Sequence, residues 1–547
     1  MPGSGRRSLW ATFAAIAAAC ALAFSGITSD KLWDDEANTA IFARNLLERG
    51  ALTAWDGKNV IGFRDGAELD ENLKNVFMPP LQYWLAAGGI ALFGGDELGL
   101  RAPFVLVGLI CLIALALLAR GLLGEGFTWS LAVWIAALSP AFLLYIRNCR
   151  YFAPGAALCI GLLALAVGRI PTRRSLAFRA VGAAACSALL MLTSYFNAVA
   201  TLAALPLLAV FAELRTRRHA IVVAAAWAAA GAVGAYVLST SNPFDRPVPR
   251  PDEMSGLPRL ATLLWWNLRD LGTFEYLPVV LVPVLALPLF FRRLAGVRRT
   301  AVAGLAVIGM ILVAVVTTTA FSPQSASRST IADLRYLVPV IPLGAIATAA
   351  AVRILWQIAR PLAAGTLCVA VFSNLLHLGF LGAYNGWLPP KGIQCTLCRY
   401  VEEVATDRTT ATEALIDYIE KIPKDEVLLV FPQYMGYSAA YYLPDRAFCC
   451  QLRGDHPLTP RLRAELPDYV FWEKAQVGRA LINAPRPFLP EGPLMIRGIE
   501  MGRFRYVDAL DFPARDCSRP EIPWHAFGGD DIRAVRYHKF FVVTVTR

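Results

Sequence analysis

Three consecutive carboxylates, Asp34, Asp35 and Glu36, follow the first long apolar run of the chain and precede an amphipathic segment. Like charges crowded beside a membrane surface are energetically unfavourable, so the cluster needs a reason. A carboxylate can take a proton from a hydroxyl group, and three acids in a row can also hold a divalent cation. The alternative is structural: an aspartate here caps the helix that follows, and its charge favours the helix N-terminus.

Arginine and tyrosine side chains recur at the ends of two later apolar segments. The candidate residues are Arg147, Arg150 and Tyr151 in the turn 145–151, and Arg335 and Tyr336 at the start of a late segment. Guanidinium groups bind phosphate bidentately, so arginines that meet the acidic cluster would suit displacement on a lipid-linked phospho-sugar. Alternatively, the arginines of the turn are interfacial anchors, Arg335 pairs locally with Asp333, and Lys74 in the preceding polar loop is simply solvated.

The composition predicts a protein that crosses a membrane many times. Of 547 residues, 56% are hydrophobic and 17% are charged, and the mean hydropathy is +0.49; about a quarter of the residues are charged in a soluble domain. The 52 Lys and Arg residues exceed the 41 Asp and Glu residues, which fits basic residues at cytoplasmic helix ends. Because no basic patch interleaved with aromatic residues stands apart from the apolar segments, we exclude nucleic acid as a partner.

Eleven segments are predicted to span the membrane. They are residues 9–27, 101–119, 128–145, 153–167, 180–195, 196–211, 220–238, 276–291, 301–320, 336–354 and 361–383. Arg6 and Arg7 precede the first, and no small-residue cleavage motif ends it cleanly, which predicts an uncleaved span with a cytoplasmic N-terminus. Residues 81–93 are too few for a span and include a Tyr-Trp pair, so we expect a horizontal interfacial helix there.

This assignment places the basic loops 169–179, 215–219 and 292–299 in the cytoplasm, as the positive-inside rule requires. Residues 29–100 then lie on the outer side and form a catalytic loop, with an amphipathic helix over 36–48 and a loop over 55–73. We therefore divide the chain into a transmembrane domain, 1–384, and an extracytoplasmic domain, 385–547. The latter should be a small α/β or α+β domain. Its expected elements are a helix over 413–421 and strands over 427–431, 469–472 and 540–545.

Of the eleven cysteines, five lie inside apolar spans (Cys20, Cys111, Cys159, Cys186 and Cys368) and five lie in the C-terminal region. Those of the C-terminal region are Cys395, Cys398, Cys449, Cys450 and Cys517. The spacing of Cys395 and Cys398 fits a disulfide, a redox pair or half of a metal site, and we favour a structural disulfide on an oxidising side of the membrane. The chain has no second such pair, which argues against a four-cysteine zinc site.

Several motifs resemble one family in order and spacing. They are WDDEA at 33–37, ARNL at 43–46, MPPLQYWL at 78–85, LFG at 92–94, LRAP at 100–103 and DLRYLVPVIP at 333–342. Together they resemble the GT-C superfamily of membrane glycosyltransferases, and within it the protein O-mannosyltransferase and lipid A aminoarabinose transferase group. The resemblance covers about the first two-thirds of the chain.

The resemblance implies inverting transfer from a polyprenyl-phosphate sugar at the outer face. Asp35 would be the general base, Glu36 would help to hold the acceptor or a metal, and Arg335 with Tyr336 would lie near the phosphate. The chain departs from the family pattern at two places: Met78 stands where relatives carry lysine, and Asn148 where they often carry an acid. Lys74, four residues earlier, would compensate for the missing lysine. Metal dependence stays open, because the family has metal-free members.

We therefore expect a glycosyltransferase with a polyprenyl-phosphate-linked sugar donor, in the cytoplasmic membrane of a bacterial cell with its outer face in the periplasm. The expected acceptor is a hydroxyl or phosphate group of a lipid, glycan or protein. The first alternative is a transporter or flippase of a lipid-linked saccharide, which should show two repeated halves and charges near the midplane. The second is a membrane-anchored binding module that acts through the C-terminal domain and tolerates changes in the acidic cluster. Neither repeats nor midplane charges are evident in the sequence.

Overall fold

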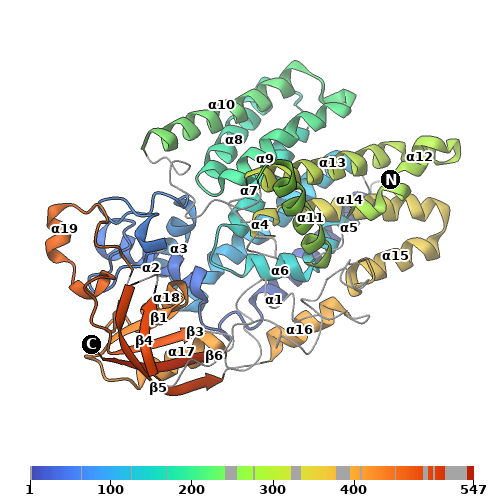
Figure 1. Ribbon diagram of the computed structural model, residues 1–547. Helices are drawn as coiled ribbons and strands as arrows, with labels where there is room; N and C mark the ends of the chain where they lie inside the picture. Colours follow the sequence, from blue (N-terminus) through green and yellow to red (C-terminus); the bar gives the residue numbers. More distant parts are fainter. Residues whose placement is uncertain are drawn as a thin grey trace.

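The computed structural model describes residues 3–546 except 63, 125, 169, 241–254, 275–277, 322–333, 377–394, 407–409, 450, 484–490, 497–498 and 512–538. In this part of the chain, a large helical bundle meets a smaller mixed region at one end (Figure 1). The mixed region combines residues from the early polar segment, drawn in blue, with the C-terminal region, drawn in orange and red. The predicted boundary at residues 384 and 385 lies outside the described residues.

Most of the bundle consists of apolar helices. The helices are α1 (Gly3–Phe24), α4 (Glu97–Leu123), α5 (Thr128–Ala137), α6 (Pro140–Ile146), α7 (Phe152–Val167), α8 (Arg173–Met191), α9 (Tyr195–Ala204), α10 (Arg217–Thr240), α11 (Gly256–Phe274), α12 (Val282–Phe290), α13 (Arg298–Phe321), α14 (Val340–Ile358) and α15 (Arg360–Phe372). Two further helices, α2 (Asp34–Arg49) and α3 (Leu81–Phe93), belong to the early polar segment and its apolar end. Both begin and end close to the predicted positions.

Six described helices are long and apolar enough to cross a membrane, and α5 with α6 forms a seventh candidate that is bent by 64°. Shorter apolar helices of 10–17 residues include α3 and four that coincide with the predicted spans 153–167, 196–211, 276–291 and 361–383. Each of the eleven predicted spans therefore coincides with a helix. The number of spans stays a prediction, because those four helices are shorter than a bilayer normally requires.

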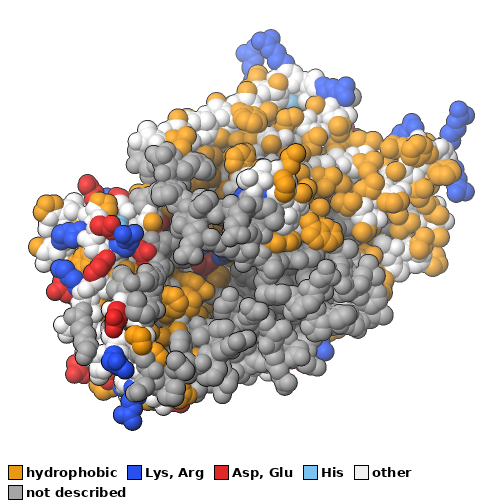
Figure 2. Space-filling model, in the orientation of Figure 1, with side chains coloured by type: hydrophobic (Ala, Val, Ile, Leu, Met, Phe, Trp, Pro, Cys, Tyr) orange, Lys and Arg blue, Asp and Glu red, His pale blue; other side chains and the backbone are white. Residues whose placement is uncertain are grey.

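The helices differ in how deeply they are packed. α14 and α4 are largely buried among other helices, whereas α8 and α10 are mostly exposed. Exposed apolar side chains such as Phe178 and Trp227 lie on these outer helices, as expected for surfaces that face lipid. Figure 2 shows hydrophobic side chains over the bundle, with Lys and Arg gathered at the tips away from the mixed region. The basic residues that open α8, α10 and α13 thus lie at the end remote from α2.

The mixed region contains a six-stranded sheet in the order β2-β1-β3-β6-β5-β4. Its strands are β1 (Val427–Phe431), β2 (Ala447–Phe448), β3 (Arg479–Asn483), β4 (Glu491–Ile496), β5 (Ile499–Asp511) and β6 (Lys539–Thr546), and its helices are α17 (Ala411–Glu420), α18 (Gly436–Tyr442) and α19 (Pro460–Glu465). A further helix of the C-terminal region, α16 (Thr396–Ala405), lies against the bundle beside α15 (Figure 1). β1 pairs in parallel with β2 and β3, and the remaining pairs are antiparallel. The predicted α/β or α+β class is confirmed, as are β1, β6 and α17. The predicted strand over 469–472 is wrong: Asp468–Val470 forms a 3-10 turn.

The early polar loop and the C-terminal region share one hydrophobic core. Phe42, Leu69 and Tyr83 pack there with Leu452 and Phe471. Polar contacts join the same two parts: fully buried Asn59 donates to the carbonyl of Arg446 at 2.9 Å and accepts from the amide of Phe448 at 2.8 Å. The loop therefore folds against the C-terminal region, and both lie at one end of the bundle.

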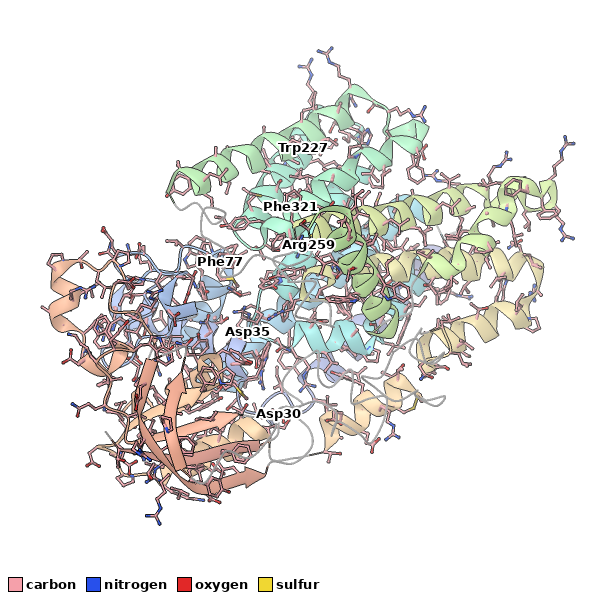
Figure 3. All side chains as sticks on the ribbon, viewed as in Figure 1. Asp30, Asp35, Phe77, Trp227, Arg259 and Phe321 are labelled. Atoms are coloured by element: carbon pink, nitrogen blue, oxygen red, sulfur yellow. A yellow bond between two sulfur atoms is a disulfide. The ribbon has the colours of Figure 1, made fainter. Side chains whose placement is uncertain are left out.

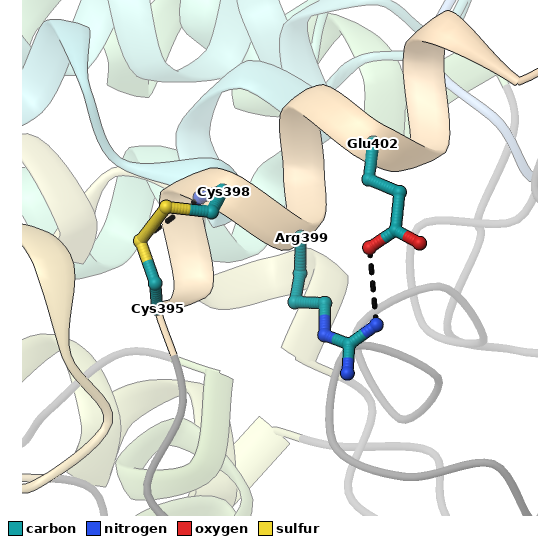
Figure 4. Close-up of a disulfide and its surroundings, with 4 residues drawn as sticks. All are labelled: Cys395, Cys398, Arg399 and Glu402. Carbon is teal, nitrogen blue, oxygen red and sulfur yellow. Dashed lines mark hydrogen bonds and ion pairs between the residues drawn. A yellow bond between two sulfur atoms is a disulfide. The ribbon is translucent and has the colours of Figure 1, made fainter.

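The predicted disulfide between Cys395 and Cys398 is present at the start of α16. Figure 4 shows it beside the exposed ion pair of Arg399 and Glu402, whose charged atoms are 3.0 Å apart. Cys449 is a buried free thiol. Cys450 and Cys517 lie outside the described residues.

Candidate active site

Asp35 lies in the first turn of α2 and meets two arginines from distant parts of the chain. Nη1 of Arg335, in the 3-10 helix η6 (Leu334–Leu337), lies 2.5 Å from Oδ2 of Asp35, and Nη2 of Arg150 lies 3.5 Å from the same oxygen. The Asp35 side chain is 27% exposed, whereas Arg150 is buried. Figure 3 places Asp35 where α2 meets the helical bundle. One carboxylate thus combines two cationic partners with access to solvent.

Arg150 is held in place by α2. Its Nη1 donates to the carbonyl oxygen of Asp35 at 3.2 Å and to Oγ1 of Thr39 at 3.2 Å. Residues 35 and 39 lie one above the other on a helix, so one guanidinium can reach both. Burial acts to lower the pKa of Arg150, but the nearby charges, led by the Asp35 carboxylate, outweigh burial, so the pKa lies above its usual value. Arg150 therefore stays cationic in the closed interior.

Aromatic rings bring the two arginine segments together. Tyr151 stacks on Tyr336 with ring centroids 6.0 Å apart and planes at 15°. Phe196 packs edge-on against Tyr336 at 4.8 Å. The amide of Tyr151 donates to Oε1 of Gln82 at 3.2 Å, which ties the turn to α3. The structure thus brings four of the expected residues together around Asp35: Arg150, Tyr151, Arg335 and Tyr336.

Glu36 has different surroundings from Asp35. Its two carboxylate oxygens accept from Nε and Nη2 of Arg101 at 3.0 and 2.7 Å, and Oε1 also accepts from the amide of Cys149 at 3.0 Å. Glu36 is fully buried, and Arg101 is buried with it. Arg101 in addition donates to the carbonyls of Ile27 and Asp30 at 2.8 Å. The expected contact of Glu36 with an acceptor does not fit this geometry, because both of its oxygens are occupied and closed off from solvent.

The same donors bear on the suggested metal site at Asp35 and Glu36. A divalent cation prefers oxygen ligands that are free of competing cations. Here each carboxylate is already paired with a guanidinium. Within the described residues, no group of three or more Asp, Glu, His or Cys side chains is arranged to hold a metal ion. The donor set at Asp35 and Glu36 fits arginine pairs and does not fit a shared cation.

The first residues of α2 do not act as expected for a helix cap. The helix begins at Asp34, and the N-cap position is taken by Trp33. All three acids therefore lie inside the first turn, where they favour the positive end of the helix dipole. Asp34 is buried. The indole of Trp33 donates to Oδ1 of Asn148 at 2.6 Å, so the residue that departs from the family pattern holds the start of α2.

Arg147 and Lys74 lie apart from Asp35. Arg147 donates to the carbonyl of Gly26 at 2.7 Å and to the hydroxyl of Tyr400 at 3.3 Å, and thereby links α1, the turn and α16. Lys74 is exposed, and its backbone amide donates to Oδ1 of Asp70 at 2.8 Å. Within the described residues, no ion pair or hydrogen bond joins either side chain to Asp35. Their expected role at a phosphate therefore does not fit their positions. Asp333 lies outside the described residues.

Three residues of the site were not expected from the sequence. Arg101 neutralises Glu36, Thr39 orients Arg150, and Tyr83 is a buried phenol whose pKa is raised by burial. Within hydrogen-bonding geometry, the Tyr83 hydroxyl has no partner among the described residues. Two of the three could have been found from the sequence, because Arg101 and Tyr83 both lie inside motifs that carry the family resemblance. Thr39 is recognisable only as the residue one turn after Asp35.

The arrangement supports one kind of chemistry. A partly exposed carboxylate can accept a proton from a hydroxyl that approaches from the solvent side. The partly exposed Arg335 beside it can bind the oxygens of a phosphate, and the buried Arg150 adds positive charge behind the carboxylate. Glu36 and Arg101 form a closed pair that holds α2 against α4. The candidate base and the candidate phosphate-binding groups are thus close enough to act on the two sides of one phosphate-linked carbon.

Comparison with known proteins gives three findings. The family model described as dolichyl-phosphate-mannose-protein mannosyltransferase matches residues 78–241. The apo crystal structure of ArnT from Cupriavidus metallidurans is similar with a TM-score of 0.50 and 17% identity, over 86% of this chain and 92% of that chain. The oligosaccharyltransferase AglB from Archaeoglobus fulgidus is similar with a TM-score of 0.47 and 12% identity, over 87% of this chain and 69% of that chain.

A curated sequence, an uncharacterised protein of Aquifex aeolicus (strain VF5), is 38% identical over 76 residues. That match covers 14% of this chain and 15% of that protein's length. The mannosyltransferase match and the ArnT fold confirm the resemblance to the GT-C group expected from the sequence. The match at residues 78–241 includes α3, α4 and the turn whose Arg150 contacts Asp35.

Proposed function

We propose that this chain is a membrane glycosyltransferase that transfers a sugar from a polyprenyl-phosphate carrier to an acceptor at the outer face of the cytoplasmic membrane. The observation that carries the proposal is the convergence of Arg335 and Arg150 on one oxygen of Asp35. The family description of the matching model, a dolichyl-phosphate-mannose-dependent transferase, supports a donor of the same chemical class. The favoured acceptor group is a hydroxyl of a lipid, glycan or protein.

In the proposed reaction, Asp35 takes the proton of the acceptor hydroxyl as its oxygen attacks the anomeric carbon. The new carbon–oxygen bond forms while the bond from that carbon to the phosphate oxygen breaks. The polyprenyl phosphate leaves with the bond electrons, and its added negative charge is stabilised by Arg335 and Arg150. Attack from the side opposite the phosphate inverts the anomeric configuration.

The outer-face assignment follows from charge and position together. Asp35, the early loop and the C-terminal region lie at one end of the bundle, and the basic residues that open α8, α10 and α13 lie at the other. If the basic end is cytoplasmic, the site faces outward. Polyprenyl-phosphate sugars would then approach through the lipid around the bundle.

The substitution Asp35→Asn tests the proposal. We expect purified Asp35→Asn to lose transfer by about 100-fold or more, because the amide cannot accept the proton at neutral pH. The assay uses labelled undecaprenyl-phosphate hexoses and pentoses, with membrane lipid, cell-wall glycan and protein as acceptors. The matched control is Glu48→Gln, the same change at an exposed position on the same helix, which should transfer at the wild-type rate.

Two outcomes would contradict the proposal in different ways. Full transfer by Asp35→Asn would remove Asp35 as the base. Absence of transfer by the wild-type protein with every donor and acceptor would favour a transporter or a binding module.

A further inference from the structure

The segment that leads into α2 is held by a tyrosine from the C-terminal region. The hydroxyl of Tyr442, the last residue of α18, accepts from the amide of Leu32 at 3.0 Å and donates to Oε1 of Glu97 at 2.7 Å. One hydroxyl thus acts as donor and acceptor at once. Leu32 lies three residues before Asp35, so this hydrogen bond acts on the backbone that sets the start of the helix.

An ion pair also holds the segment that leads into α2. Nζ of Lys31 lies 3.2 Å from Oε1 of Glu97 and 4.8 Å from the centre of the Tyr442 ring. Glu97 is buried, so its carboxylate depends on these partners. Tyr442, Lys31 and Glu97 together fix the chain just before α2 against the start of α4.

α18 also holds the middle of α2. Ala439 and Ala440 are buried small residues, which allow the two helices to approach closely. The carbonyl of Tyr441 accepts from Nη1 of Arg44 at 3.0 Å, and the Arg44 guanidinium lies 5.0 Å from the centre of the Tyr441 ring. The Tyr441 hydroxyl donates to the carbonyl of Gly95 at 2.6 Å. α18 therefore contacts the segment just before α2 through Tyr442, and α2 itself through Arg44.

We infer that Tyr442 is a positioning residue through which the C-terminal region sets the place of Asp35. The inference rests on the proposed function, in which the carboxylate of Asp35 must meet the acceptor hydroxyl. Tyr442 touches neither substrate nor Asp35; it acts through the backbone of residues 30–36. The C-terminal region thus contributes to the active site, because it holds the backbone that sets the position of Asp35.

The α18 helix offers a matched control. Tyr437 is buried and Tyr442 is half-buried, and Tyr437 donates its hydroxyl to the carbonyl of Gly62 at 2.7 Å, in the early loop away from the start of α2. Tyr442→Phe and Tyr437→Phe each remove one hydroxyl from one helix and keep the ring. They differ in the segment that loses its hydrogen bond.

We expect Tyr442→Phe to lower kcat by about 10- to 100-fold with the donor KM within about twofold of wild type, because misplacement of a reacting group slows the chemical step. Tyr437→Phe should keep kcat within about twofold. Amide hydrogen exchange gives a readout independent of turnover: the peptide with residues 30–36 should exchange faster in Tyr442→Phe and unchanged in Tyr437→Phe.

Wild-type kcat in Tyr442→Phe, an equal loss in Tyr437→Phe, or unchanged exchange over residues 30–36 would each overturn the inference. If the wild-type protein transfers no sugar, the proposed function fails, and faster exchange over residues 30–36 in Tyr442→Phe alone would still support the positioning contact. Unfolding of both variants to the same extent would show that the hydroxyls serve packing in general.

Discussion

Neighbouring acids have opposite surroundings because a helix turns by about 100° at each residue. Asp35 points toward Arg335 and reaches solvent, whereas Glu36 points into the bundle and meets Arg101. The first geometry suits a group that exchanges a proton with substrate. The second suits a permanent ion pair. The pair of acids expected to act together at the substrate thus divides into a candidate base and a structural anchor.

Arg335 should matter for phosphate binding more than for folding. We expect Arg335→Ala to weaken the binding of undecaprenyl phosphate by about tenfold or more, because a charge-assisted hydrogen bond to phosphate is lost. The measurement is a titration of purified protein by microscale thermophoresis. The control is Arg299→Ala, which removes an exposed arginine paired with Glu213 on a different part of the protein. Equal weakening in both variants would contradict a specific role of Arg335.

At the scale of elements, the ion pair of Glu36 and Arg101 joins α2, α4 and the turn before α7. Arg101 adds contacts to the carbonyls of Ile27, Asp30 and Lys31, so one guanidinium fixes the end of α1 and the start of α2 together. Removal of one partner from a buried pair leaves an uncompensated charge, which is far less favourable than the loss of an exposed pair.

We therefore expect Glu36→Gln to destabilise the protein by about 3 kcal/mol or more. Asp35→Asn should destabilise it less, because Asp35 and Arg335 are each 27% exposed and the buried Arg150 keeps its hydrogen bonds to the Asp35 carbonyl and Thr39. The midpoint of thermal unfolding in detergent, followed by tryptophan fluorescence, checks the order. The double variant Glu36→Gln with Arg101→Met should recover part of the loss, since no buried charge is left alone. A larger effect of Asp35→Asn than of Glu36→Gln would show that the two acids have been assigned the wrong way round.

For the whole molecule, buried and half-buried tyrosines contribute to the contact between the C-terminal region and the N-terminal part of the chain. Tyr400, Tyr441 and Tyr442 donate their hydroxyls to Leu22, Gly95 and Glu97, and Tyr437 donates to Gly62 in the early loop. Such hydroxyls satisfy polar groups at an interface while the rings supply apolar area. The two parts therefore depend on protonated phenols for their contact.

These phenols predict how stability changes at high pH. Burial raises the pKa of Tyr83, Tyr400, Tyr441 and Tyr442 above the usual value, and burial with the charge of Asp56 raises the pKa of Tyr469 to about 12. Above about pH 10 the unfolded chain loses these protons and the folded protein keeps them, so stability falls as pH rises, by up to about 1.4 kcal/mol per pH unit for each tyrosine.

The midpoint of thermal unfolding between pH 9 and pH 11 measures this fall. Because other groups also titrate there, Tyr442→Phe is the comparison: its midpoint should decline less steeply than that of the wild type. Parallel curves for the two proteins would contradict the assignment of the fall to buried phenols.

Features that depend on local pattern could be predicted from the sequence. Runs of apolar residues predicted a helix at each of the eleven expected spans, the short segment 81–93 predicted α3, and the continuous apolar run at 427–431 predicted β1. Hydrophobic periodicity is a property of neighbouring residues, so it can be recognised in the sequence without knowledge of tertiary contacts. The short apolar run at 469–472 predicted a strand but forms a turn, in which Val470 and Phe471 pack against early-loop residues such as Leu69, far away in the sequence.

The tertiary structure alone decided which charges meet. Spacing singled out Asp35 and Glu36 together, but only the packing of α2 against α4 gives Arg101 to Glu36 and leaves Asp35 for Arg335, 300 residues away. Likewise, the turn brings Arg150 to Asp35 and turns Arg147 toward Gly26 and Tyr400. Ion pairs form over a few ångströms, and that distance is set by how the helices pack, which no local pattern in the sequence records.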